Sequence, residues 1–187
     1  MIINPRNYRV TQTLWDGTAL TIRAIQPDDR GKVVAAFMNL DRESIYTRFF
    51  THKSSLSEKE LRQLTDVDFH HVVALVVTTR TKDGETIIAG ARYVADDAPR
   101  PCRRAEMAFT TEEDYQGRGI ARLLLQHLAR IARENGVSQL QADVLAGNQP
   151  MLTVFRRSGL PMQQHSADGA IHVTLSLPPD SAESSAH

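Results

Sequence analysis

Cysteine is nearly absent from this chain of 187 residues, which contains only Cys102. A single cysteine excludes an internal disulfide and a metal site built from several thiolates, and it is typical of a protein kept in a reducing compartment. The adjacent histidines His70 and His71 begin a predicted strand, so their side chains point to opposite faces and make a poor metal-binding pair. We therefore expect a cytoplasmic protein that uses no metal ion.

Long apolar segments and an excess of one charge are missing as well. No apolar run approaches the roughly 18 residues of a membrane-spanning helix, and residues 1–5 lack the apolar core of a signal peptide. Lys plus Arg and Asp plus Glu number 22 each, so bulk charge gives no reason to expect a nucleic acid or a membrane as partner. The length suits one soluble domain, as a monomer or a homodimer.

Apolar and β-branched residues between turn residues predict strands along most of the chain. The predicted strands are residues 8–14, 19–25, 72–79, 87–94, 105–111, 139–144 and a final pair turned at Asp168-Gly169. The first two form a hairpin at Asp16-Gly17. Trp15, beside this turn, is expected to be a packing anchor rather than a platform for a ligand.

The clearest helix covers residues 118–134, where apolar residues recur on one side. This stripe consists of Ile120, Leu124, Leu128 and Ile131, and Asn135-Gly136 ends the helix. A helix beginning at Pro27 is expected to turn Val33, Val34, Phe37 and Met38 inward. Further helices are predicted at residues 43–50, at 57–64 with a capping box of Ser57 and Glu60, and at 150–158.

Residues 115–121, Tyr-Gln-Gly-Arg-Gly-Ile-Ala, join a predicted strand to the longest helix. Gly117 and Gly119 let the backbone approach a ligand closely, and the unpaired N–H groups at the positive end of the helix favour an anion such as pyrophosphate. Arg118 adds a mobile positive charge. The stretch is neither a Walker loop nor a Rossmann fingerprint, and by itself it is equally compatible with a plain tight turn.

With its flanking strand and helix, this stretch resembles the signature of GNAT N-acetyltransferases, Gln/Arg-x-x-Gly-x-Gly/Ala, and the resemblance extends over residues 20–175. Gln116, Gly119 and Ala121 fill the pattern. The resemblance implies that acetyl-CoA is the co-substrate. The residues implied to contact its pyrophosphate are Gln116, Gly117, Arg118, Gly119, Ile120, Ala121 and Arg122. Residues 22–29 and 44–50 are similar to the bacterial protein-lysine acetyltransferases (Pat-like domains) within that family.

The same resemblance implies an α/β (α+β) fold with a central mixed, mostly antiparallel sheet of six to seven strands flanked by helices. The domain itself is expected at residues 20–177. Residues 1–19 would then be an N-terminal hairpin or extension, and residues 178–187, rich in Ser, Ala and Pro, a disordered tail.

Acetyl transfer to an amine needs a group that removes a proton, because a lysine ammonium has a pKa of about 10.4. Glu106 lies on the strand before the glycine turn among apolar neighbours, which predicts lost solvation and a raised pKa. The resemblance implies that this glutamate is the general base, directly or through a water. The alternative is a surface glutamate on the outer face of a strand.

Further coenzyme contacts follow from the resemblance alone. Phe109, Thr110 and Thr111 would pair with the pantetheine amide as another strand does, and a backbone N–H near Thr110 would stabilise the oxyanion. Asn148 would contact the coenzyme, although it also suits a helix N-cap. Phe155 stands where many members carry a tyrosine acid, so the thiolate would leave as an anion or be protonated by water.

The favoured function is therefore acetyl-CoA-dependent N-acetylation of a primary amine, with protein lysine as the preferred acceptor. The alternatives are a small-molecule amine acetyltransferase and a non-catalytic module that senses acyl-CoA. The acidic run Glu112, Glu113 and Asp114 is expected to be a solvated loop, or else to attract a cationic acceptor.

Overall fold

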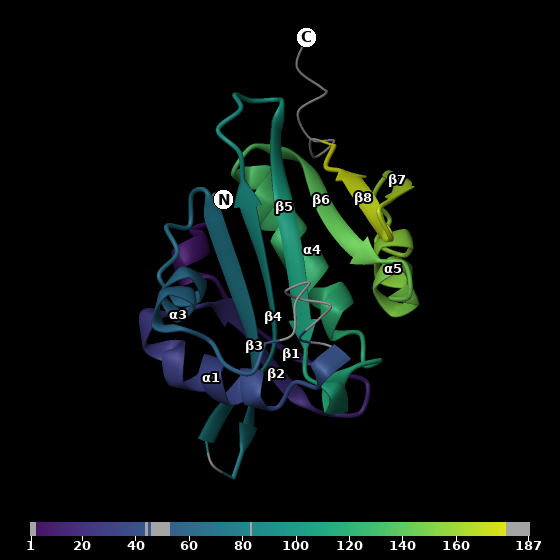
Figure 1. Ribbon diagram of the computed structural model, residues 1–187. Coiled ribbons are helices and arrows are strands. Elements are labelled where there is room, and N and C mark those ends of the chain that lie inside the picture. Colours follow the sequence, from purple (N-terminus) through teal and green to yellow (C-terminus); the bar gives the residue numbers. More distant parts are fainter. Residues whose placement is uncertain (1–2, 44, 46–52, 83, 179–187) are drawn as a thin grey trace.

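The structure is a computed structural model that describes residues 3–43, 45, 53–82 and 84–178. Within these residues one sheet contains eight strands in the order β1-β2-β3-β4-β5-β6-β8-β7 (Figure 1). Most of the predicted helix at residues 43–50, and the predicted tail from residue 179 onward, lie outside the described residues.

All the predicted strand segments are found. The strands are β1 (Arg9–Thr13), β2 (Ala19–Ala24), β3 (Val72–Thr81), β4 (Gly84–Ala95), β5 (Arg103–Thr111), β6 (Val137–Leu145), β7 (Met162–Ala167) and β8 (Ala170–Ser176). Neighbouring strands are antiparallel except β5 and β6, which are parallel. The sheet exceeds the expected six to seven strands because β1 pairs with β2 and becomes its edge.

Four complete α-helices lie among the described residues, and they cover the two faces of the sheet. They are α1 (Arg30–Met38), α3 (Glu58–Thr65), α4 (Ile120–Glu134) and α5 (Gln149–Arg156), accompanied by short 3-10 turns at Pro5–Asn7, Pro27–Asp29 and Glu113–Tyr115. Figure 1 shows α4 crossing behind β5 and β6, with α1 and α3 at the lower left. No helix of the described chain has the length and apolarity to cross a bilayer.

The parallel pair β5 and β6 is connected through α4. The predicted apolar stripe of α4 is buried, because Ile120, Leu124, Leu128 and Ile131 all pack into the core. The helix must return the chain from the end of β5 to the start of β6. Its N-terminus therefore lies beside the end of β5, which is where the glycine turn is found.

Two packing predictions are wrong. Phe37 of α1 is buried, but Val34 is 40% and Met38 68% exposed, because these two lie on the stripe adjacent to the one that carries Val33 and Phe37. Trp15 is 85% exposed rather than a packing anchor. It lies at the tip of the β1–β2 hairpin, where a tight turn from Leu14 to Thr18 brings few other side chains close.

A buried ion network fixes α1 to the sheet. The guanidinium of Arg23 on β2 contacts Asp29 at 2.7 Å and Glu85 on β4 at 2.8 Å. Although burial opposes ionisation, the hydrogen bonds from Arg23 keep the pKa of Asp29 below its usual value. The predicted capping box also forms, with Ser57 N donating to Glu60 Oε2 at 2.9 Å at the start of α3. The Arg23 network ties the start of α1 to β2 and β4, whereas the capping box is internal to α3.

Candidate active site

The glycine turn between β5 and α4 has the backbone conformation that only glycine adopts easily. Gly117 has φ of 73° and Gly119 has φ of 84°, and Gly119 is the N-cap of α4. An added Cβ at either position would meet nothing within 4 Å. Glycine is therefore required by backbone geometry, and the space in front of the turn is open.

This turn presents backbone donors to that space. Among the described residues, the backbone N–H groups of Gly117 and of residues 119–122 donate no hydrogen bond within the protein. These groups stand at the positive end of the α4 dipole, where an anion is stabilised. Gln116 Nε2 donates to Thr111 O at 3.1 Å and ties the turn to the end of β5. The arrangement suits a diphosphate held by main-chain N–H groups.

Arg118 is anchored rather than mobile as predicted. Its Nη1 donates to Asp16 Oδ2 at 3.2 Å, and its guanidinium lies 5.1 Å from the centroid of the Tyr115 ring. The backbone N–H of Thr18 is the main reason why the pKa of Asp16 is lowered, with Arg118 adding to the effect. The N-terminal hairpin therefore reaches the turn through an ion pair between residues 102 positions apart, for which no local pattern gives a signal.

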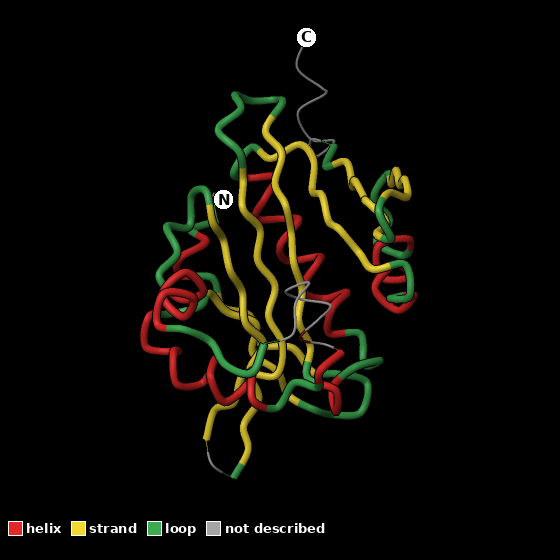
Figure 2. Tube along the Cα trace, in the orientation of Figure 1, coloured by secondary structure: helices red, strands yellow, loops and turns green. Residues whose placement is uncertain are grey.

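The strands β5 and β6 separate beside this turn. They are paired only from Arg103 to Glu106 of β5, opposite Val137 to Gln141 of β6, while β5 runs on to Thr111. Figure 2 shows the two strands diverging toward the glycine turn. Phe109 and Thr110 therefore have a strand partner on the β4 side, Ala91 and Gly90, and an open edge on the other side within the described chain. This is the slot in which an extended amide chain can add to β5.

Two of the predicted coenzyme contacts lie at the α5 side of the slot. Phe155 is 1% exposed, and its ring meets Phe109 edge-on with centroids 5.9 Å apart. Asn148 caps α5, accepting from Met151 N at 3.2 Å, so the N-cap alternative is confirmed. Only the amide nitrogen of Asn148 remains to donate to a ligand.

Glu106 is the last residue of β5 that is paired with β6. Its side chain lies on the face opposite α4 and is exposed, as the alternation of buried and exposed residues along β5 shows. The expected loss of solvation among apolar neighbours does not occur, because Ala105 and Met107 point to the other face of the sheet. The carboxylate instead stands in the open at the point where β5 and β6 part.

An apolar cavity of about 130 Å³ lies beside this point, under α1. Its lining comes from segments far apart in sequence: Ile25, Val33, Phe37, Leu56, Leu64, Val76, Ile88, Arg92, Ala108, Thr110 and Glu112, among others. Sequence reasoning missed this cavity and missed Arg92, because neither has a local pattern. Thr110 was singled out for its backbone, and its side chain faces the cavity.

The acidic run after β5 is not a plain solvated loop. Glu112 lines the cavity, and burial, followed by repulsion from Asp114 and Glu113, raises its pKa. Glu113 accepts a hydrogen bond from Asp41 N at 3.1 Å. Only Asp114 of the three is classed as exposed. The run therefore places one partly buried carboxylate at the cavity and uses a second to hold the chain after α1.

The first turn of α4 also opens a cationic groove. Ile120 is buried in the core, whereas Arg122 is exposed and lines a hollow of about 340 Å³ together with Arg130 and Arg133. Ala121 lies between them in the same turn of the helix. The predicted phosphate contacts thus comprise main-chain donors at the turn and one guanidinium on the adjacent helix surface.

Comparison with known proteins agrees with this geometry. Residues 36–160 match the model of the Acetyltransferase (GNAT) family. An acetyltransferase of Pseudomonas aeruginosa is 32% identical over 141 residues, which are 75% of this chain and 74% of that protein. Acetyltransferase Pat of Mycolicibacterium smegmatis is 28% identical over 158 residues, or 84% of this chain and 46% of that protein, so the chain spans about half of its length.

Solved structures share the fold. The GNAT domain of S. lividans PAT gives a TM-score of 0.81 at 33% identity, covering 90% of this chain and 97% of that domain. A cAMP-binding acyltransferase from Mycobacterium smegmatis gives 0.60 at 27% identity, covering 92% of this chain and 48% of the other. A Salmonella typhimurium protein solved with acetyl-CoA gives 0.66 at 16% identity, covering 89% and 99%, which is a likeness of fold alone.

Proposed function

Because the chain belongs to the GNAT acetyltransferase family and is an N-acetyltransferase that uses acetyl-CoA, we propose that its acceptor is a protein lysine and that Glu106 is the general base. The resemblance of residues 22–29 and 44–50 to protein-lysine acetyltransferases and the relatives named Pat support the choice of acceptor. The single cysteine supports a cytoplasmic location as part of the same proposal.

One observation carries the role of Glu106: it is the last paired residue of β5 before the slot opens toward the glycine turn. A diphosphate held at residues 116–122 and a pantetheine chain along Phe109 to Thr111 would direct the thioester toward this point. Glu106 then removes a proton from the bound ammonium, directly or through a water, and frees the lone pair that attacks the thioester carbonyl.

The remaining steps need main-chain groups rather than an acid. A backbone N–H near Thr110 would stabilise the oxyanion, an effect of roughly 3 kcal/mol when the donor is well aimed. Phe155 has no proton to donate, and it is buried against Phe109. The coenzyme A thiolate therefore leaves as an anion or takes a proton from water.

The exposure of Glu106 favours a macromolecular acceptor. A carboxylate on an open sheet face can receive a lysine that projects from the surface of another protein, which a deeply enclosed base cannot. The cavity under α1 favours the second candidate, a small amine, because its volume of about 130 Å³ suits a side chain of amino-acid size.

The test compares Glu106→Gln with Glu112→Gln, which removes the other carboxylate near the cavity. Both are incubated with acetyl-CoA, a panel of amines and a cell lysate, while thiol release and mass shifts are followed together. We expect Glu106→Gln to lower kcat by about 10²- to 10⁴-fold, with the acetyl-CoA dissociation constant nearly unchanged. Glu112→Gln should affect KM for the acceptor more than kcat.

Two results would contradict the proposal. Full activity in Glu106→Gln would remove the general base from this position. Acetylation confined to small amines, with no lysine in the lysate modified, would establish the second candidate instead.

A further inference from the structure

Three arginines are embedded in the central sheet, and two of them are fully engaged. Arg23 contacts the carboxylates of Asp29 and Glu85. Arg103 donates through Nε, Nη1 and Nη2 to the carbonyl oxygens of Asp96, Asn135 and His70, each at 3.1 Å. In both cases the guanidinium, which has five N–H donors, has acceptors on every side.

Arg92, the third, is left largely unengaged. In the described part of the chain it forms no ion pair, and its one hydrogen bond runs from Nη1 to Gln63 O at 3.3 Å. Burial lowers the pKa of Arg92, and the charge of nearby Glu106 opposes that effect. A partly buried cation that forms no ion pair and only one hydrogen bond is unfavourable unless other groups compensate its charge. Carboxylates compensate Arg23 and three carbonyl oxygens compensate Arg103, whereas within the described chain most N–H donors of Arg92 are available to a ligand.

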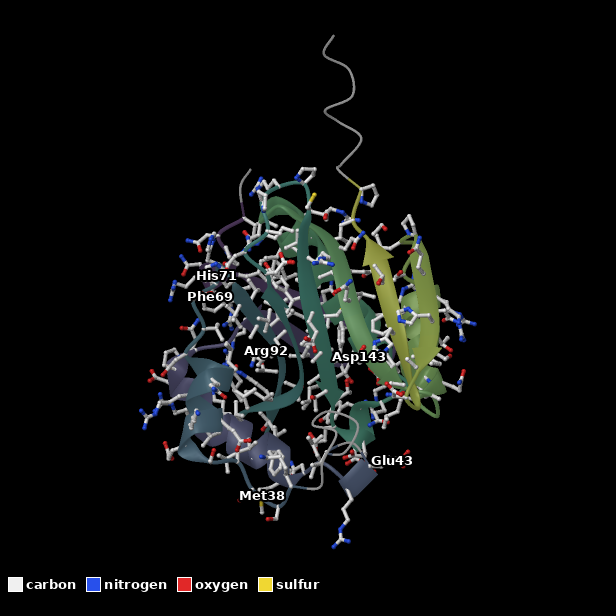
Figure 3. All side chains as sticks on the ribbon, turned by 45° about the horizontal axis from the view of Figure 1, so that its top comes forward. Met38, Glu43, Phe69, His71, Arg92 and Asp143 are labelled. Atoms are coloured by element: carbon white, nitrogen blue, oxygen red, sulfur yellow. The ribbon has the colours of Figure 1, made fainter. Side chains whose placement is uncertain are left out.

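The position of Arg92 relates it to the acceptor rather than to the coenzyme. It lies on β4 opposite Ala74 of β3 and Ala108 of β5, on the face away from α4 (Figure 3). The small side chains of both neighbours leave room above the sheet, and Arg92 lines the apolar cavity. Glu106 is paired with Val94, two residues along β4, so Arg92 and Glu106 are diagonal neighbours, roughly 7–8 Å apart on one face of the sheet.

We propose that Arg92 binds a carboxylate of the acceptor, so that the preferred acceptor is a primary amine with a carboxylate close by. This inference rests on the proposed function and names its substrate class. The amine faces Glu106, the carboxylate faces Arg92, and an apolar portion occupies the cavity under α1. Such a carboxylate has two sources: an Asp or Glu beside the target lysine, or the carboxylate of a free amino acid.

The experiment uses matched acceptors that differ only in this charge. The first arm compares peptides with a single lysine flanked by Glu or by Gln, and the second compares free amino acids with their amides. In the arm whose compounds are acetylated, we expect the wild-type protein to prefer the acceptor that carries the carboxylate. The expected preference is about tenfold or more in kcat/KM, mainly through a lower KM.

Variants assign the preference to one side chain. Arg92→Gln should abolish it, and Arg92→Lys should retain part of it. Arg104→Gln, which changes an exposed arginine on the same face of the neighbouring strand β5, should leave it intact. The acetyl-CoA dissociation constant, measured by calorimetry, and the melting temperature of each variant establish that folding and coenzyme binding are preserved.

The outcomes separate this inference from the proposed function. Equal acetylation of both members of each pair, or a preference that survives Arg92→Gln, overturns the role of Arg92 while N-acetylation stands. A change in the pH profile of kcat without a change in KM would make Arg92 a positioning residue for Glu106 and would also overturn it. If acetyl-CoA binds and no acceptor in either arm is acetylated, the proposed function fails and this inference fails with it.

Discussion

The glycine turn and the cavity under α1 lie on the two sides of the same slot, yet they are built in opposite ways. The turn consists of consecutive residues, 116–122, and the groups that it offers to a ligand are main-chain N–H groups. The cavity is assembled from α1, α3, three strands and the loops between them, and the groups that it offers to a ligand are mostly apolar side chains. In the proposed function, the coenzyme half of the site is therefore local, and the acceptor half is a product of the whole fold.

Because of this difference, substitutions should be able to change acceptor choice and co-substrate binding separately. Side chains around the cavity can vary without altering the turn, so one coenzyme site can serve many acceptors. Changes in the turn affect the co-substrate whatever the acceptor is. The two halves should therefore fail independently when each is perturbed alone.

The largest effect is expected from breaking the ion network that holds α1 over the cavity. Asp29→Ala leaves Arg23 buried with only Glu85 as partner, which should lower the free energy of unfolding by about 3–5 kcal/mol. Asp66→Ala, which removes the exposed pair with Arg30, should cost less than about 1 kcal/mol. Urea unfolding measures both, and similar losses in the two variants would show that burial of the Arg23 network is unimportant.

A smaller effect is expected from straining the turn. Gly119→Ala forces an alanine to φ near 84°, a strain of roughly 1–2 kcal/mol, so acetyl-CoA affinity should fall about tenfold while acceptor preference is kept. Gly169→Ala imposes the same strain at φ of 79° in the β7–β8 turn and should leave affinity unchanged. Calorimetric titration decides, and equal affinity losses would mean that the effect is not local to the coenzyme turn.

Lower pH should weaken the turn that precedes β3 through Asp68. Its Oδ1 accepts from the N–H groups of His70, His71 and Val72, each at 2.9 Å, at the start of β3. Although burial opposes the shift, these hydrogen bonds lower the pKa of Asp68 to about 2, against about 3.9 in an unfolded chain. The stabilisation is present above pH ~4 and lost as pH falls toward 2.

The stability gap between the wild-type protein and Asp68→Asn should therefore narrow across that window, as measured by urea midpoints at successive pH values. A gap that stays constant down to pH 2 would show that the charge of Asp68 contributes nothing.

The smallest effect is expected from the Asp16–Arg118 ion pair, which connects the glycine turn to the distant N-terminal hairpin. Asp16→Asn weakens the hold on Arg118, so acetyl-CoA affinity should change by no more than a few-fold. Trp15 is the only tryptophan and is 85% exposed next to Asp16, so its fluorescence should report occupancy of the turn. We expect acetyl-CoA to alter this signal in the wild-type protein and to alter it less in Asp16→Asn.

The predictability of each half follows from its construction. Nearby residues encode the strand segments and the buried stripe of α4, so sequence periodicity located them. The turn at Gly117 and Gly119 is also local, and its glycine motif located it. The exposure of Val34 and Met38 was missed because the helical pattern does not reveal which of two adjacent apolar stripes meets the sheet. Arg92 and the Asp16–Arg118 pair depend on contacts between distant segments, for which one sequence carries no signal.

Because β5 and β6 are paired only from Arg103 to Glu106, the sheet consists of two parts, β1 to β5 and β6 to β8. These parts are joined by that short stretch of pairing and by α4. A pantetheine chain in the gap would act as a removable strand, supplying hydrogen bonds to the edges of β5 and β6 that are not paired with each other. In each catalytic cycle, acetyl-CoA binding would add this strand and coenzyme A release would remove it. Amide hydrogen exchange along the facing edges of Phe109 to Thr111 and of Ala142 to Leu145 should slow when acetyl-CoA is present and quicken when it departs.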